Sequence, residues 1–166
     1  PPRVGLHWLE APMSPVSLDL PSGLVVFRRL VLDYTGTLSL DGRLLHGVGP
    51  RLARLSKDLR IKILTADTFG TVYDELEGLP VEIQIIGDGR EKAGIVASMD
   101  PAEVIAVGNG RNDVPMMGVA GLSIAIVGPE GAAAELLTAA DVVVGDINAA
   151  LDLILHPLRL RATLRD

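Results

Sequence analysis

Short polar segments of this chain combine residue types that can bind and transfer a phosphoryl group. Asp33 ends an apolar run and is followed closely by the turn Thr35–Gly36–Thr37. A carboxylate at the end of a strand can attack a phosphorus atom, while the N–H groups of a glycine turn hold the other phosphate oxygens. Asp33 is therefore the candidate nucleophile, and Gly36 and Thr37 are candidate phosphate-binding residues.

Three further segments supply the other groups that phosphoryl transfer requires. The next strand-like run ends in Thr65, whose hydroxyl and N–H can bind a phosphoryl oxygen. Lys92 can neutralise the negative charge of the transferring group. A glycine-rich segment carries an amide at Asn109 and a carboxylate at Asp113, which are hard oxygen ligands of the kind that Mg²⁺ prefers. Together these residues predict a phosphoryl-transfer site with a magnesium ion.

Each segment taken alone also has a simpler structural interpretation. An Asp before a glycine turn is more often an Asx turn, Thr65 can cap a helix, and Lys92 can form an exposed pair with Asp88. Asn112 can cap the helix that follows the glycine-rich segment, and Arg111 is expected to be solvated. We favour the functional interpretation because all four segments occur in order at the ends of expected strands and helices.

Apolar runs alternate with segments of helical period from about residue 29 onward. Runs of Val, Ile and Leu without polar alternation are typical of strands buried on both faces of a parallel sheet. The expected strands are residues 29–33, 61–65, 81–86, 104–108, 123–128 and 141–144. The expected helices are residues 50–59, 68–76, 90–99, 112–119, 129–138 and 147–155, with Pro50 and Pro129 as start signals. This alternation predicts an α/β fold with a three-layer, doubly wound parallel sheet, which binds ligands beyond the carboxyl ends of its strands.

Two segments fall outside this alternation, and both are expected to form β-hairpins. Residues 1–28 contain two apolar runs around Pro21–Ser22–Gly23, which predicts an N-terminal hairpin extension. In residues 38–45 an Asp-Gly pair lies between alternating apolar residues, which predicts a small flap after the first strand of the sheet. Because no linker or repeat is visible, we expect residues 1–166 to form a single domain.

Composition and charge exclude several classes of protein. Apolar residues make up 48% and charged residues 22% of the 166 residues, which excludes intrinsic disorder. The net charge of −6 and the 3% of aromatic residues argue against nucleic-acid binding. The chain has no cysteine, which excludes zinc–thiolate sites. No apolar stretch approaches the roughly 20 residues of a membrane helix, and without a signal peptide the protein is expected to be soluble and cytoplasmic.

The ordered motifs resemble those of the haloacid dehalogenase-like phosphohydrolases. The matching segments are LVLDYTGTL, ILTADT, Lys92 and VIAVGNGRNDVPMM, which lie within residues 29–117. Within that superfamily the chain looks most like the soluble, P-type-ATPase-like branch. Its DYTGT and TAD segments are similar to the Asp-Lys-Thr-Gly-Thr and Thr-Gly-Asp motifs of P-type ATPases. The resemblance implies a Rossmann-type sheet and a Mg²⁺-dependent phosphatase.

The resemblance also implies roles for individual residues. Asp33 would form an aspartyl-phosphate, and Thr65 and Lys92 would bind and neutralise the phosphoryl group. The expected catalytic residues are Asp33, Thr35, Thr65 and Lys92. The expected metal ligands are Asp33, the backbone carbonyl of Thr35, Asn109 and Asp113. The expected substrate-binding residues are Gly36, Thr37, Ala66, Asp67 and Asn112.

Two positions depart from the pattern of the family. Its phosphatases usually carry a second Asp two residues after the nucleophile as general acid and base, where this chain has Thr35. Since general acid–base catalysis contributes about 10²–10⁴-fold, we expect slow hydrolysis of the phosphoenzyme. Acyl phosphates and anhydrides should be affected least. Asn109 stands where the family has Asp, and the missing negative charge predicts weaker metal binding.

The spacing of the motifs leaves no room for an inserted cap or nucleotide-binding domain. Only residues 38–64 separate the first two motifs, and only residues 66–91 separate the second from the third. The site is therefore expected to be capless and open to a small phosphorylated substrate or a phosphorylated macromolecule. Water would be excluded by the flap, by a bulky substrate or by a second subunit of a homo-oligomer.

Two other functions compete with the phosphatase. A catalytically weak regulatory or phospho-accepting module is the first, because receiver domains also place Asp, Thr and Lys at successive strand ends. Those domains carry the phosphorylated Asp after the third strand, whereas Asp33 follows the first strand of the expected sheet. A nicotinamide-dependent oxidoreductase is the second, and it is disfavoured because the Gly-x-Gly sequence at residues 108–110 follows the fourth strand.

Overall fold

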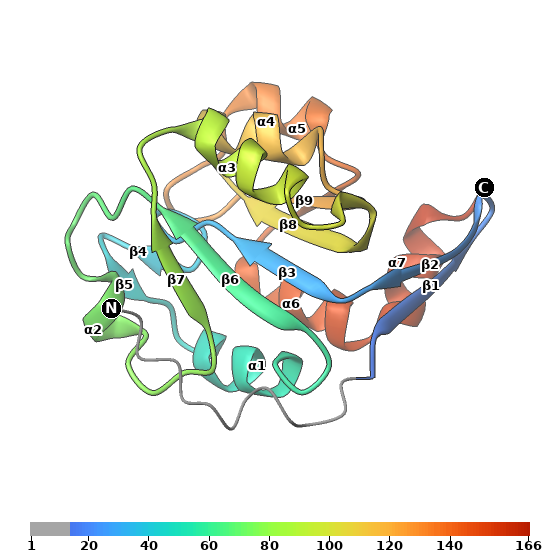
Figure 1. Cartoon of the computed structure of the whole chain (residues 1–166), viewed down its shortest axis with the longest axis horizontal. Helices are drawn as coiled ribbons and strands as arrows, with labels where there is room; N and C mark the ends of the chain where they lie inside the picture. The colour runs from blue at the N-terminus through green and yellow to red at the C-terminus, as the bar shows by residue number, and fades with distance from the viewer. Residues whose placement is uncertain (1–13) are drawn as a thin grey trace.

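The computed structural model describes residues 14–166, and a six-stranded parallel sheet forms its centre (Figure 1). The strands follow the order β10-β9-β8-β3-β6-β7 across the sheet. Their bounds are β3 Arg29–Leu32, β6 Arg60–Thr65, β7 Glu82–Ile85, β8 Val104–Gly108, β9 Leu122–Ile126 and β10 Val142–Val144. The chain adds β6 and β7 on one side of β3 and then returns to add β8, β9 and β10 on the other side. The winding direction reverses between β3 and β8, which is where doubly wound sheets bind ligands.

Helices cover both faces of this sheet (Figure 1). On one face lie α1 (Val48–Leu55) and α6 (Ile147–Leu155), and on the other lie α3 (Gly89–Ala97), α4 (Val114–Met117) and α5 (Ala134–Ala139). Short 3₁₀ turns span Pro101–Glu103 and Arg111–Asp113. The predicted α/β fold with a three-layer, doubly wound parallel sheet is confirmed.

Two hydrophobic clusters, one on each face, explain why the central strands lack polar alternation. Side chains of a strand alternate between the two faces of a sheet. In β3, Leu30 and Leu32 therefore pack into one cluster and Val31 into the other, and all three are fully buried. A strand that is buried on both faces has no solvent-facing position for a polar residue.

Both predicted hairpins are present among the described residues. Strand β1 (Val16–Leu20) pairs antiparallel with β2 (Gly23–Phe27), and α7 (Pro157–Leu164) packs against β1. The flap consists of β4 (Ser39–Leu40) and β5 (Arg43–Leu44). Its turn residues Asp41 and Gly42 have φ angles of 51° and 79°, the left-handed conformation that favours an Asp-Gly pair in a two-residue hairpin turn. Residues 1–13 of the expected N-terminal extension lie outside the described residues.

Several helix boundaries differ from the sequence prediction. Helix α1 starts at Val48, so Pro50 lies within its first turn, where a proline is tolerated. Pro129 does not start a helix: it lies in a turn closed by a hydrogen bond from Gly131 N to Gly128 O, and α5 begins at Ala134. The expected helix over 68–76 is reduced to one turn, α2 (Val72–Glu75). The error at Pro129 arises because proline is favoured in tight turns as well as in first helical turns.

No cap domain interrupts the sheet within residues 14–166. Between β3 and β6 the chain forms only the flap and α1, and between β6 and β7 it forms only α2. In the same part of the chain, no helix has the length and apolar character needed to cross a membrane.

Candidate active site

The sheet brings the predicted site residues to one end of its strands. Asp33 follows β3 directly, and its N–H donates a hydrogen bond to the carbonyl of Val107 in β8, at 3.0 Å. Thr65 is the last residue of the adjacent β6, and Gly108 is the last residue of β8. Because these strands are parallel and pair in register with β3, their carboxyl ends meet at the switch point.

A buried lysine between two carboxylates forms the centre of the site. Lys92 Nζ lies 2.6 Å from Asp33 Oδ1 and 2.7 Å from Asp113 Oδ1. The side chains of Lys92 and Asp113 are fully buried, and Asp33 is 5% exposed. Buried charges of this kind require partners, so the three groups position one another. The alternative, an exposed pair of Lys92 with Asp88, is absent, since the Asp88 carboxylate instead accepts hydrogen bonds at the N-terminus of α3.

The same burial determines the protonation of the site. Desolvation, reinforced by the nearby Asp113 carboxylate, raises the pKa of Asp33 from 3.8 to about 7, against the lowering effect of Lys92. Burial lowers the pKa of Lys92, but the two neighbouring carboxylates outweigh it and raise that pKa overall. Lys92 is therefore a cation at neutral pH. A further positive charge beside Asp33 would favour its ionised form.

Thr37 and Asn109 lie on the other side of the Asp33 carboxylate. The Thr37 hydroxyl oxygen is 3.0 Å from Asn109 Oδ1 and 3.3 Å from Asp33 Oδ2. A hydroxyl has one proton to donate. The Thr37 hydroxyl can therefore donate to Asn109 Oδ1 or to Asp33 Oδ2, and the other oxygen receives no hydrogen bond from it. The amide of Asn109 is oriented by its Nδ2, which donates to the carbonyl of Gly131 at 3.0 Å.

These oxygens fit a hard cation. The carboxylate of Asp33 and the amide oxygen of Asn109 both lie within hydrogen-bond distance of the Thr37 hydroxyl, and both are hard oxygen donors. With the backbone carbonyl expected at Thr35, they would supply oxygen ligands of the kind that Mg²⁺ accepts together with water. Within residues 14–166, no group of three or more His, Cys, Asp or Glu side chains is arranged to hold a metal ion. A cation here would therefore depend on the amide and the carbonyl as well as on Asp33.

Asp113 is engaged by the protein on both carboxylate oxygens. Oδ1 accepts from Lys92, and Oδ2 accepts from the N–H groups of Asn109 and Gly110, each at 3.0 Å. A Cβ at Gly108 would lie 2.4 Å from Asp113 Oδ2, so only glycine lets the carboxylate come this close. In this arrangement Asp113 orients the lysine and the glycine-rich loop, while the Asn109 amide oxygen shares the Thr37 hydroxyl with the Asp33 carboxylate.

The segment after β6 differs from its expected role in part. Thr65 is buried and does not cap a helix; its hydroxyl accepts a hydrogen bond from the N–H of Asp67 at 2.9 Å. Asp67 has a left-handed backbone, with φ of 52°, and its carboxylate accepts from the N–H groups of Thr71 and Val72 at the start of α2. Asp67 thus stabilises the start of α2, while Ala66 beside it is exposed.

The remaining predicted residues lie on the glycine-rich loop. Asn112 is exposed and does not cap the following helix, because Gly110 is the N-terminal cap of the 3₁₀ turn there. The backbone carbonyl oxygen of Asn112 would lie 2.4 Å from a Cβ at position 89. Helix α3 therefore approaches this loop closely only because residue 89 is a glycine. Arg111 is exposed, as expected, and its side chain pairs with Glu135. The sequence analysis did not identify Gly89. A glycine three residues before the candidate Lys92 could have indicated a close approach of the backbone there.

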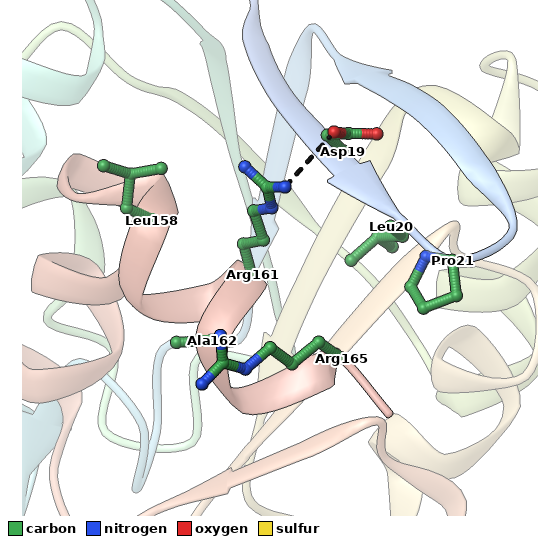
Figure 2. A pocket seen from close by; sticks show the side chains of 7 residues that line it. All are labelled: Asp19, Leu20, Pro21, Leu158, Arg161, Ala162 and Arg165. Atoms are coloured by element: carbon green, nitrogen blue, oxygen red, sulfur yellow. Dashed lines mark ion pairs between the residues drawn. The ribbon is translucent and has the colours of Figure 1, made fainter.

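A groove of about 560 Å³ shares no residue with this cluster. It lies between the β1–β2 hairpin and α7, where Arg161 pairs with Asp19 at 3.4 Å (Figure 2). Its other lining residues are Leu20, Pro21, Leu158, Ala162 and Arg165. The candidate catalytic groups therefore lie at the strand ends, and this groove is not part of the candidate site.

Comparison with known families agrees with the arrangement at the strand ends. Residues 91–151 match the family of haloacid dehalogenase-like hydrolases. This stretch contains Lys92, Asn109 and Asp113. Asp33 and Thr65 lie before the matched stretch. Their resemblance to the family rests on the short motifs DYTGT and TAD alone.

Two relatives match part of the chain. An uncharacterised protein of Methanocaldococcus jannaschii is 48% identical over 64 residues, which are 39% of this chain and 69% of that protein. A phosphoglycolate phosphatase of Halorubrum lacusprofundi is 43% identical over 60 residues, which are 36% of this chain. The matched part is 25% of that phosphatase, so the activity of the whole enzyme does not transfer directly.

Several solved structures share the fold. A protein of Vibrio cholerae described as a 3-deoxy-D-manno-octulosonate 8-phosphate phosphatase superposes with a TM-score of 0.66 at 18% identity, over 85% of this chain and 95% of that one. The corresponding phosphatase of Moraxella catarrhalis, solved with magnesium and phosphate ions, gives 0.61 at 18% identity over 78% and 86% of the two chains. The catalytic domain of the CPx-ATPase CopB gives 0.57 at 24% identity over 67% and 45%. At these identities the likeness is one of fold.

Proposed function

The chain belongs to the haloacid dehalogenase-like hydrolase family, and we propose that it is a Mg²⁺-dependent phosphatase that acts through an aspartyl-phosphate on Asp33. The observation that carries this proposal is the Asp33–Lys92–Asp113 cluster at the switch point of the sheet. A carboxylate paired with a buried ammonium group at the carboxyl ends of the strands would serve as a nucleophile toward a phosphoryl group.

In the first step of the proposed reaction, a carboxylate oxygen of Asp33 forms a bond to phosphorus as the bond from phosphorus to the leaving oxygen breaks. Lys92 keeps a positive charge beside Asp33 while negative charge accumulates on the phosphoryl oxygens. The Thr65 hydroxyl, which accepts a hydrogen bond from the N–H of Asp67, would donate its proton to one of these oxygens. When bound by Asp33, the carbonyl of Thr35 and Asn109, Mg²⁺ would neutralise part of the phosphate charge. In the second step, water attacks phosphorus and releases inorganic phosphate and the free Asp33 carboxylate.

Thr35 limits both steps because it stands where a carboxylic acid would protonate the leaving oxygen and later activate water. A hydroxyl cannot exchange a proton near neutral pH in this way. We therefore expect slow turnover of alkyl phosphates, and faster turnover of acyl phosphates whose leaving groups need no proton.

The relatives indicate the class of substrate. The names of the phosphatases from Halorubrum lacusprofundi and Vibrio cholerae denote small phosphorylated acids, phosphoglycolate and 3-deoxy-D-manno-octulosonate 8-phosphate. Within residues 14–166 no cap domain is inserted between the strands, which would leave this end of the sheet accessible to a molecule of this size. We therefore favour a small phosphorylated acid over a phosphorylated macromolecule.

The direct test of the proposal is the Asp33→Asn variant. The wild-type protein with Mg²⁺ should hydrolyse 2-phosphoglycolate or acetyl phosphate, and it should retain an acid-stable, hydroxylamine-sensitive phosphoryl group after rapid quenching. The variant should lose both turnover and this phosphoenzyme. Unchanged turnover in Asp33→Asn would refute the assignment of the nucleophile.

A phosphate-binding or phospho-accepting module without appreciable turnover is the second candidate. Two observations favour it, namely Thr35 in place of the acid and Asn109 in place of a charged metal ligand. Such a module would become phosphorylated on Asp33, or bind inorganic phosphate with Mg²⁺, and would release no product in the same assay.

A further inference from the structure

One carbonyl oxygen at the tip of the flap accepts hydrogen bonds from two hydroxyl groups that belong to different segments of the chain. The carbonyl of Gly42 accepts a hydrogen bond from the Tyr34 hydroxyl at 2.9 Å and another from the Thr71 hydroxyl at 2.6 Å. Tyr34 directly follows the candidate nucleophile Asp33, and Thr71 precedes α2. The flap lies beside α2 (Figure 1), so this oxygen links the nucleophile loop, the flap and the segment after β6.

The turn of the flap packs closely against the segment that precedes α2. Gly42 is buried, and a Cβ there would lie 2.5 Å from the Cβ of Phe69 and 2.8 Å from the Thr71 hydroxyl oxygen. Tyr34 is fully buried, and desolvation raises its pKa to about 12, so its hydroxyl keeps its proton and remains a donor at physiological pH. The turn is therefore packed and hydrogen-bonded at the same point.

Two further contacts hold the flanks of the flap. The N–H of Leu44 donates to Glu75 Oε2 of α2 at 2.8 Å, and the N–H of Asp41 donates to Glu130 Oε2 at 3.3 Å. Glu130 lies next to Gly131, whose carbonyl accepts from the side chain of Asn109. The flap is thus attached to α2 at one side and to the loop that orients the candidate metal ligand at the other.

From these contacts we infer that Tyr34 and Thr71 are positioning residues that latch the flap as a fixed wall of the capless site, which restricts the site to compact phosphomonoesters. Lifting the flap would leave the buried Gly42 carbonyl without its two donors, and an unsatisfied buried acceptor is costly. A compact ester fits beside a fixed wall, whereas a bulky one needs the wall to move. The latch stands independently of catalysis, while its effect on substrate size rests on the proposed phosphatase function.

Amide hydrogen exchange of the intact protein tests the latch without any substrate. Tyr34→Phe and Thr71→Val each remove one hydroxyl and keep the shape of the side chain, and Tyr73→Phe removes an exposed hydroxyl from α2 as a matched control. Each single variant should accelerate exchange of flap residues 39–45 by about three- to tenfold. In the double variant, the acceleration of flap exchange should exceed the product of the two single accelerations, because the buried Gly42 carbonyl then loses both donors. Exchange in β8 should not change.

Unchanged flap exchange in the double variant would overturn the latch. Because Thr71 is only partly buried, Thr71→Val also tests the same carbonyl if Tyr34→Phe perturbs the core. Faster exchange over the whole sheet would also count against the latch, since it would show a general loss of stability.

Substrate discrimination tests the role of the fixed wall. We compare kcat/KM for 2-phosphoglycolate with that for 4-methylumbelliferyl phosphate, a bulky ester. In the latch variants the ratio should fall by at least about threefold, because the bulky ester gains access while the compact ester loses its fixed wall. An equal loss on both esters would overturn the size restriction. If wild-type protein hydrolyses neither of these esters nor acetyl phosphate, the proposed function fails, and the exchange experiment still decides whether the latch exists.

Discussion

Lys92 Nζ and Asp33 Oδ1 lie 2.6 Å apart, although the two residues are 59 positions apart in the sequence. The lysine comes from the first turns of α3 and the aspartate from the end of β3, and Asp113 holds the lysine from a third segment. The charge of the candidate nucleophile, the position of α3 and the glycine-rich loop are therefore coupled through one buried ammonium group.

Replacing Lys92 with methionine should destabilise the protein strongly. The variant leaves Asp33 and Asp113 buried without their cation, and breaking a buried ion pair in this way costs about 3–5 kcal/mol. Urea denaturation at pH 7 measures the loss, and Lys57→Met at an exposed position is the control, which should change stability little. Adding Asp113→Asn to Lys92→Met should recover part of the stability, and a double variant no more stable than the single one would contradict the pairing.

The stability of the metal-free protein should depend on pH through Asp33. The pKa of Asp33 is raised from 3.8 to about 7 in the folded state, so its contribution to stability is present below pH 4 and is lost as the pH rises through 7. In the Asp33→Asn variant the side chain at position 33 is an amide, which does not titrate. The stability of wild type relative to this variant should therefore fall between pH 4 and 7, by up to about 4 kcal/mol at roughly 1.4 kcal/mol per pKa unit.

Denaturation curves with EDTA at several pH values measure this difference. Mg²⁺ should reduce the fall in the wild type, because a cation beside Asp33 favours its ionised form. A difference between wild type and Asp33→Asn that does not vary with pH would show that the Asp33 carboxyl titrates in its ordinary range.

Introducing an acid at position 35 should shorten the lifetime of the phosphoenzyme. Thr35→Asp supplies the group that can activate water, and general acid–base catalysis accelerates such a step by about 10²–10⁴-fold. Rapid-quench measurement of phosphoenzyme decay tests this, with Thr35→Asn as a control of similar shape without the acid. If Thr35→Asp and Thr35→Asn decay at the same rate, the missing acid does not explain slow turnover.

Restoring a carboxylate at position 109 should tighten metal binding. Asn109→Asp adds a negative charge close to Asp33 Oδ2, and metal affinity follows the charge of the ligands, so the Mg²⁺ concentration for half-maximal activation should fall by about tenfold or more. Asn112→Asp places the same charge at an exposed position of the same loop and should change this Mg²⁺ concentration much less. Equal effects of the two variants would indicate a long-range charge effect and no direct contact at residue 109.

The sequence alone was sufficient to predict the sheet, both hairpins and the order of the polar segments. Strands β3 and β8 are largely apolar because both of their faces are covered, and this property is visible in the sequence alone. The flap was predictable for a similar reason, since its Asp-Gly turn has a local conformational preference. The segments that follow these strands could be assigned to one site because parallel strands end at the same edge.

The tertiary structure alone determined the partners of each side chain. Spacing assigned Lys92 to the same site as Asp33 but also allowed an exposed pair with Asp88, and only the packing of α3 against the glycine-rich loop shows it between Asp33 and Asp113. Likewise, nothing local to Tyr34 indicates that its hydroxyl reaches Gly42. Periodicity and turn preference report the conformation of adjacent residues, whereas hydrogen bonds and ion pairs between distant segments depend on how closely helices, strands and loops approach. For this protein the sequence predicts which groups reach the strand ends, and the packing determines which of them meet.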